Sequence, residues 1–376
     1  MKLFWTLVAL VSLATTAAAQ DAPEFIALTL DDGALQVGPI EGNDISFSSD
    51  GKTDVLLVER SDGAVFDAAV PHLWLVSTTS GERFVGRLVS ADDAGVKLAA
   101  EGVGVLELSL DEIVAISKAS ARIDSSQQAI DRLVLRNGDT AEGFFAGLDD
   151  EGRFLLDTDA DRLEIEADRV AGLVLAEGAA SEPNDATVAV LLTDRSLIRA
   201  QEFELAGDRF RLVWQDRVME GLAKRVLAVE PLGMQTVWVA DMEPTSVTHA
   251  PFFTATHPPR IGRGLASSFD GDDLPSRSVT LRPSSTLTYE VPSGVTRLRG
   301  GVSILADASR PYADVAVRVV VGDRIAFEQE SLTPDAGVVL FDVDLDGAET
   351  ISLIVDFGGN LDVQDDVLFL RPILLP

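Results

Sequence analysis

The chain has 376 residues, a formal net charge of −31 and no cysteine. The missing thiols exclude a disulfide framework and a cysteine nucleophile. A surface this acidic repels phosphate backbones, so we do not expect nucleic acid as a partner. Hydrophobic residues nevertheless make up 46% of the chain, which is far more than an unfolded acidic tail contains. Folded domains with buried cores are therefore expected.

The first residues have the pattern of a secretory signal peptide. Lys2 precedes an apolar stretch over residues 3–13, and small residues follow at 17–19. The stretch is shorter than the roughly 20 apolar residues that a membrane-spanning helix needs. We expect a signal peptide over residues 1–19, a secreted or periplasmic location, and no integral membrane segment once it is removed.

An internal repeat is the strongest signal in the sequence. Short runs of alternating apolar and polar residues are separated by Gly, Asp or Asn, as is typical of β-strands. Five landmarks recur at an offset of 57 residues: Gly81 and Gly138, Gly86 and Gly143, Leu108 and Ile165, Ile113 and Val170, and Ile116 and Leu173. A constant offset over five pairs predicts two β repeats, at residues 71–120 and 129–177.

Two degenerate copies extend the series. Residues 186–232 form one, in which Arg195 and Ala200 replace the two glycines, and residues 20–70 form another. Each unit has a turn at the first glycine, a second strand that contains the second glycine, and further short strands. This pattern resembles Sm-like or SH3-like barrels in shape. Separate small barrels and one continuous sheet both fit it. The best helix candidates are residues 125–132 and 111–116.

The last third of the chain predicts a β-sandwich or jelly roll. Eight strands are expected there, at residues 278–281, 287–291, 296–304, 315–321, 324–328, 337–344, 350–356 and 367–373. The whole protein is thus expected to be all-β, with tandem small β-barrel-like or β-sheet repeats followed by this sandwich.

The same third resembles a known family. The segments SSTLTYEVPSGVTRLRGGVSI, VAVRVVVGDRIAFEQESLT and VVLFDVDLDGAETISLIVDFGGNLDVQDDVLFLRPILL follow the motif order of NPCBM, the carbohydrate-binding module of glycosyl hydrolase family 98. The resemblance covers residues 244–376 and implies a galactose-binding-like jelly roll that binds carbohydrate. The chain departs from the family where it carries Asp366 and Phe369, since members often have His and then Trp after the V-Q-D stretch.

Catalytic and metal-binding motifs are not found in the sequence. The three histidines, His72, His249 and His257, do not have the spacing of a zinc site, and no nucleophile motif accompanies them. Residues 342–347 imitate the start of a calcium loop, but Leu353 stands where the bidentate Glu belongs, so we interpret this segment as a strand that leads into a turn. No cofactor is expected; calcium stays open without a complete motif.

Ligand-binding candidates lie before the last strand and among the aromatic residues. We nominate Asp362, Gln364 and Asp365, whose polar side chains can face an ion or a sugar. Aromatic rings can stack on sugars, and the exposed candidates are Phe252, Phe253, Trp238 and Tyr312. Tyr289 and Phe369 are expected in the core.

These features favour a secreted, non-catalytic binding protein. Its C-terminal module would bind a polysaccharide or glycoconjugate of the cell envelope, and its repeats would act as a spacer or contact an envelope protein. The alternative is a structural scaffold whose module docks the repeats without binding sugar. A glycoside hydrolase is the third reading, because paired carboxylates are abundant.

Overall fold

The computed structural model is all-β and divides into two compact units. One unit spans Ala19–Gly233, here called the repeat unit, and the other contains Met234–Pro376, here called the C-terminal unit. The structure describes residues 24–31, 34–40, 44–48, 55–60, 72–100, 103–121, 123–124, 129–176, 185–233, 236–250, 258–265, 277–305, 313–359 and 366–376. The expected signal peptide over 1–19 lies outside these ranges. Within them, no helix is long and apolar enough to cross a membrane.

We number the repeats in chain order, and the second repeat, at residues 71–120, is a five-stranded antiparallel sheet. Its strands are β5 (Trp74–Thr78), β6 (Arg83–Ala91), β7 (Gly95–Ala100), β8 (Gly104–Ser109) and β9 (Ile113–Lys118), paired in the order β9-β5-β6-β7-β8. Alternate residues of β5 are buried, as for Trp74 and Val76. The short 3₁₀ helix η2 (Leu110–Glu112) turns the chain from β8 into β9, so it replaces the helix expected over 111–116.

The third repeat has the same topology. It consists of β10 (Asp131–Leu135), β11 (Thr140–Leu148), β12 (Phe154–Asp157), β13 (Arg162–Ile165) and β14 (Val170–Val174), in the order β14-β10-β11-β12-β13. The predicted helix over 125–132 is wrong at its end, where Asp131 and Arg132 begin β10, because these residues pair with β11 and β14. Residues 125–128 lie outside the described part of the chain.

The mid-strand glycines stand where a long strand passes from one partner to the next. Gly86 pairs with Trp74 of β5 and also with Ala100 of β7. A Cβ atom at Gly86 would lie 2.5 Å from the carbonyl oxygen of Ala99, and one at Gly143 would lie 2.5 Å from that of Asp157. Only a residue without a side chain lets the neighbouring backbones approach this closely at the bend.

In the fourth repeat the strand splits at the equivalent place. Its elements are β15 (Val188–Leu192), β16 (Leu197–Ala200), β17 (Glu202–Ala206), β18 (Arg209–Trp214), β19 (Arg217–Leu222), η3 (Ala223–Arg225) and β20 (Val226–Pro231). Ala200 stands in the position of the second glycine, and β16 ends there while β17 begins in a different sheet. Arg195 takes the place of the first glycine with φ 77°, close to the 90° of Gly138.

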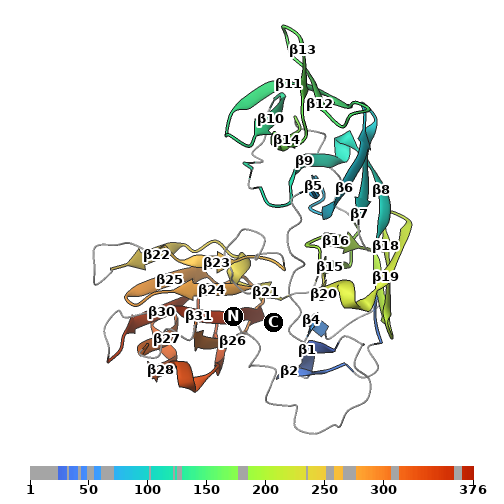
Figure 1. The fold of residues 1–376 in the computed structure, drawn as a ribbon. Coiled ribbons are helices and arrows are strands. Elements are labelled where there is room, and N and C mark those ends of the chain that lie inside the picture. Colours follow the sequence, from blue (N-terminus) through green and yellow to red (C-terminus); the bar gives the residue numbers. More distant parts are fainter. Residues whose placement is uncertain are drawn as a thin grey trace. The chain divides into compact units, whose positions relative to one another are not determined.

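The repeats join edge to edge, but not in sequence order. Antiparallel contacts link β14 to β9, β6 to β16, and β20 to β4 (Val55–Arg60). The spatial order is therefore third, second, fourth and first repeat, as the ribbon of Figure 1 lets the reader follow. Of the two arrangements left open by the sequence, the strand pairing follows the continuous sheet, since the edges of neighbouring repeats are paired across each seam. The second and third repeats each keep a five-strand order of their own within it.

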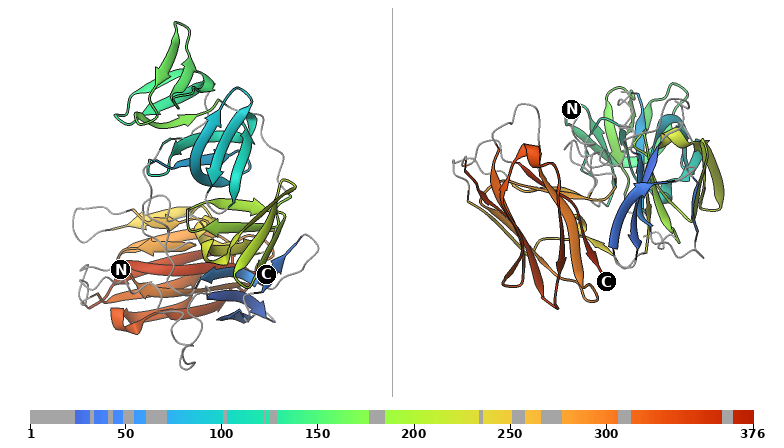
Figure 2. Two further views of the ribbon diagram at one scale, coloured as in Figure 1. Left: turned by 45° about the vertical axis from the view of Figure 1, so that its right-hand side comes forward. Right: turned by 90° about the horizontal axis from the view of Figure 1, so that it is seen from below.

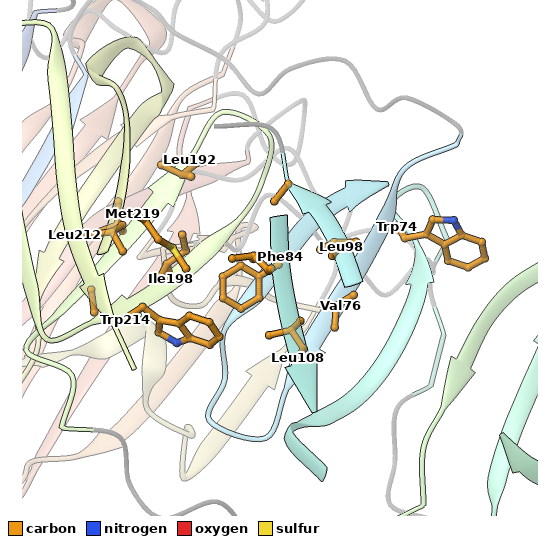
Figure 3. Close-up of a cluster of buried hydrophobic side chains, with 14 of the residues drawn as sticks. Trp74, Val76, Phe84, Leu98, Leu108, Leu192, Ile198, Leu212, Trp214 and Met219 are labelled. Atoms are coloured by element: carbon orange, nitrogen blue, oxygen red, sulfur yellow. The ribbon is translucent and has the colours of Figure 1, made fainter. Parts of the chain in front are cut away.

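The first repeat shares a sheet with the fourth. It contains β1 (Phe25–Asp31), β2 (Ala34–Pro39) and β3 (Ile45–Phe47) besides β4. Strand β3 pairs with β17, and Phe47 lies opposite Phe203. The hydrophobic core also continues across the seam between the second and fourth repeats. There the rings of Phe84 and Trp214 pack edge to face at 4.9 Å between centroids (Figure 3). Buried large side chains of this kind each contribute about 1.5–3 kcal/mol.

The C-terminal unit is a sandwich of two antiparallel sheets (Figure 2, right). One sheet has the order β23 (Arg260–Gly262), β24 (Ser278–Leu281), β31 (Val367–Leu375), β26 (Arg297–Ile304), β29 (Val339–Asp344), with β21 (Val237–Trp238) paired to β31. The other has the order β22 (Ser246–His249), β25 (Ser285–Glu290), β30 (Thr350–Phe357), β27 (Val315–Val321), β28 (Arg324–Leu332). Two further 3₁₀ turns are η4 (Val239–Asp241) and η6 (Pro334–Ala336). The strands expected at 278–281 and 315–321 are confirmed to the residue.

Candidate functional site

The nominated ligand residues Asp362, Gln364 and Asp365 lie outside the described part of the chain. The structure does place the residues that flank them, Gly359 and Asp366. The candidate site is therefore built from described residues at the end of the sandwich where β31 begins. We call this end, marked by Leu281, Ile304 and Val367, the Val367 end.

Strand register brings several segments together at the Val367 end. Val367 is the register partner of both Leu281 and Ile304 in one sheet. A turn of three residues connects Leu281 to Ser285, which begins β25 in the other sheet. The end is thus formed by parts of the chain far apart in sequence, as binding loops on a β-sandwich commonly are.

An ion pair joins the residues that adjoin β24 and β31, two neighbouring strands of one sheet, at this end. The Nε atom of Arg282 lies 2.7 Å from Oδ1 of Asp366, whose exposed fraction is 6%. The backbone carbonyl of Asp366 also accepts a hydrogen bond from the amide of Leu305 at 2.7 Å. A carboxylate this buried needs such partners, because desolvation disfavours its charged form. The pair therefore fixes the chain directly beside the nominated residues.

A second carboxylate, Asp314, anchors the neighbouring segment. Its Oδ1 accepts a hydrogen bond from Ser331 Oγ at 2.7 Å, and its Oδ2 accepts one from the amide of Gly359 at 3.0 Å. A Cβ atom at Gly359 would lie 2.8 Å from that same Oδ2. The glycine lets the backbone donate to the carboxylate at close range, so Asp314 holds the chain just before residues 360–365.

His249 is the histidine that the structure brings to this end. Its Nδ1 lies 2.8 Å from Ser285 Oγ, and its buried Nε2 makes no hydrogen bond within the described residues. His72 is exposed in the repeat unit, and His257 lies outside the described ranges. Among the described residues no group of three or more His, Asp or Glu could hold a metal ion.

The structure describes three of the six aromatic residues that the sequence analysis considered. Trp238 was expected on the surface, but it is 6% exposed because β21 pairs with β31, and Arg277 lies 5.6 Å from its ring. Tyr289 and Phe369 are fully buried in the core, as predicted. Phe252, Phe253 and Tyr312 lie outside the described part of the chain.

The calcium-like segment is a strand, as predicted. β29 ends at Asp344, and Asp346 and Gly347 form a turn with positive φ. The carboxylate of Asp342 forms ion pairs with two arginines. Its Oδ1 lies 2.9 Å from Arg297 Nη2, and its Oδ2 lies 2.9 Å from Arg299 Nη2.

Sequence reasoning did not find Arg282 or Asp314. Arg282 left no distinctive signal, since arginine also adjoins proline at residues 259–260, 310–311 and 371–372. Asp314 left no such signal, because its role depends on hydrogen bonds to residues that are 17 and 45 positions away.

A family model described as NPCBM/NEW2 domain matches residues 235–374. This match confirms the resemblance inferred from the sequence. It begins ahead of residue 244, in accord with the pairing of Val237 and Trp238 with Leu374 and Ile373. No curated protein matches the chain.

Three solved structures illustrate what the chain is similar to. The CBM51 of a Clostridium perfringens GH95 protein in complex with methyl-galactose is 16% identical, with a TM-score of 0.31, over 37% of this chain and 99% of that one. The tandem CBM51 modules of Sp3GH98, a family 98 glycoside hydrolase from Streptococcus pneumoniae, are 14% identical, with a TM-score of 0.31, over 93% and 88%. The CBM51-2 and INT domains of Clostridium perfringens ZmpB are 15% identical, with a TM-score of 0.31, over 46% and 36%. The alignment thus spans about a third of the ZmpB chain, and similarity at this level locates no binding residue here.

Proposed function

Because residues 235–374 form an NPCBM domain, we propose that this chain is a secreted, non-catalytic protein that binds carbohydrate through its C-terminal unit. The family match is the observation that carries the proposal. The ligand class is a polysaccharide or glycoconjugate of the cell envelope. The repeat unit acts as a spacer or as a surface for protein partners.

The Val367 end is the proposed binding surface. Sugar hydroxyls both donate and accept hydrogen bonds, so they are recognised by carboxylates, amides and hydroxyls held in fixed positions. Arg282, Asp366 and Asp314 fix the backbone on both sides of residues 360–365. In this proposal Asp362, Gln364 and Asp365 contact the sugar, and the buried pairs beside them hold the loop ends in place.

The test is glycan-array binding by residues 20–376 without truncation of either unit. We expect retention on at least one glycan class and a loss of about tenfold or more for the D362N/D365N variant, since each hydrogen bond to a charged group contributes about 1.5–3 kcal/mol. The matched control is D323N/E349Q, which removes the same charge. Asp323 and Glu349 are both exposed. They lie two residues from Val321 and Ile351, which are register partners, and this end of the sheet is opposite to the end at Val315.

Each failure has its own meaning. Absence of retention on every glycan would reject the proposal and favour the structural alternative, in which the module docks the repeats. Equal loss in both double variants would show general charge dependence instead of a site. Release of new reducing ends from a bound glycan would overturn the non-catalytic assignment.

A further inference from the structure

We propose that a cavity between the second and third repeats receives a lysine or arginine side chain of a partner protein. The proposal names the partner chemistry for the protein-interaction role given above to the repeats, and it is independent of glycan binding by the NPCBM domain. The cavity has a volume of about 600 Å³, within the usual range for ligand sites.

The wall of the cavity depends on a close approach between the two repeats. Gly147 in β11 has φ 111°, and a Cβ atom there would collide with the carbonyl oxygen of Ala91 and lie 2.8 Å from Cα of Asp92. This contact brings the end of β6 against the β11–β12 turn. The cavity is therefore formed by the way the two repeats join.

Part of the cavity lining is apolar. Trp74, Leu88 and Phe154 line it, and the Trp74 and Phe154 rings lie 5.2 Å apart between centroids. Val89, at its edge, is 54% exposed. Leu88 and Val89 are the apolar lining residues that a partner can reach, since Trp74 and Phe154 are buried beneath them. These two side chains fit the methylene stem of a long side chain, because lysine and arginine pack their stems on apolar groups while the charge stays near water.

The rim of the cavity is acidic. Asp149, Asp150 and Glu151 line it, and no lysine or arginine does among the described residues. Asp149 is already engaged, since its Oδ2 lies 2.6 Å from Arg153 Nε and its Oδ1 caps the turn. Asp150 is exposed and makes no ion pair or side-chain hydrogen bond within the described residues, and Glu151 lies 3.5 Å from Arg153. Two carboxylates can thus approach an incoming cation.

Charge and ring access decide between a cation and a sugar. A sugar needs an accessible aromatic face, but Trp74 is 4% exposed and Lys118 Nζ lies over its ring at 3.7 Å from the centroid. Burial against the ring also lowers the pKa of Lys118. The rim favours a positive charge, and the exposed Val89 beside it favours the aliphatic stem that carries the charge.

The probe is the fluorescein-labelled peptide Ac-Gly-Val-Lys-Val-Lys-Val-Gly-amide, measured by fluorescence anisotropy against residues 20–376 at about 0.15 M salt. A second peptide carries norleucine for each lysine, which keeps the stem and removes the charge. We expect binding of the lysine peptide only. The D150N/E151Q variant should weaken binding about fivefold to tenfold, because it removes the two carboxylates that attract the incoming charge at an exposed site. Val89→Asn should weaken it about threefold to tenfold through lost stem contact.

The matched control is D159N/D161N, which removes two exposed carboxylates from the β12–β13 turn of the same repeat. We expect it to bind like the parent chain. Equal weakening in both double variants, or no binding by the parent chain, would overturn the proposal. Displacement of the peptide by equimolar spermidine would replace a protein partner with a small polyamine and would also overturn it. Circular dichroism verifies folding, and unchanged glycan retention by D150N/E151Q separates this site from the NPCBM domain.

Discussion

Ile116 and Leu173 are equivalent residues of two repeats, and they are register partners across the seam between β9 and β14. Their neighbours follow the same rule, since Ser117 pairs with Gly172 and Ala115 pairs with Val174. Residues 115, 116 and 117 of β9 are thus paired with the equivalents of residues 117, 116 and 115 in β14. The final strands of the two repeats are therefore related by a local twofold axis. Within one chain this reproduces the isologous interface of a symmetric dimer.

Ile116 and Leu173 should be energetically coupled across the seam between β9 and β14. Ile116 and Leu173 are both fully buried, so truncation of either to alanine should lower the free energy of unfolding by about 2–5 kcal/mol. Because the two side chains share one contact, the double variant should deviate from additivity by about 0.5–3 kcal/mol in a double-mutant cycle followed by urea unfolding. Leu163→Ala, at a residue that is 37% exposed, is the control. Strict additivity would contradict the shared contact.

Two glycines with positive φ should differ sharply in their tolerance of alanine. Gly147→Ala should destabilise the protein by about 2–4 kcal/mol, because the strained φ and the collision with Ala91 act together. Gly138→Ala should lose about 1–2 kcal/mol, since open space surrounds it and Arg195 already adopts this turn conformation in the fourth repeat. Thermal unfolding compares the two variants, and equal melting temperatures would refute the close approach.

The Arg282 and Asp366 pair should stabilise the C-terminal unit. Arg282→Met should lower the free energy of unfolding by about 1–3 kcal/mol, because it withdraws a charged partner from a buried carboxylate. Adding Asp366→Asn should recover part of that loss, since the neutral amide is less costly to bury. Guanidinium unfolding measures both variants. A second substitution that only adds further loss would show that Asp366 depends on other partners more than on Arg282.

Tyr289 should resist ionisation in the folded protein. Burial raises the pKa of its phenol above the usual value of about 10, so the folded state favours the neutral form. The stability that this provides is present below pH 10 and is lost as the pH rises above it, since the unfolded chain then releases the proton more readily. Alkaline absorbance titration at 295 nm of Tyr312→Phe, which leaves Tyr289 as the single tyrosine, should show ionisation coincident with unfolding. Ionisation near pH 10 with the fold intact would contradict this.

Local patterns were sufficient for most strands of the C-terminal unit and for the glycine bends of the repeats. The short apolar-alternating runs predicted β24 and β27 to the residue, and the glycine pairs located the bends at Gly86 and Gly143. Burial of Trp238 was missed, because it depends on a two-residue strand that pairs with a segment more than 130 residues away. The anchoring role of Asp314 was missed for the same reason.

The sequence by itself determined that the protein is all-β, where most strands of the C-terminal unit run, and that the units repeat, since side-chain alternation and glycine positions are local properties. Only the tertiary structure decided which edges meet. Strand edges present backbone N–H and C=O groups that are alike in every repeat, so the choice of partner is made by packing across each seam, as between Phe84 and Trp214. The order of third, second, fourth and first repeat, and the cavity between two of them, follow from that choice.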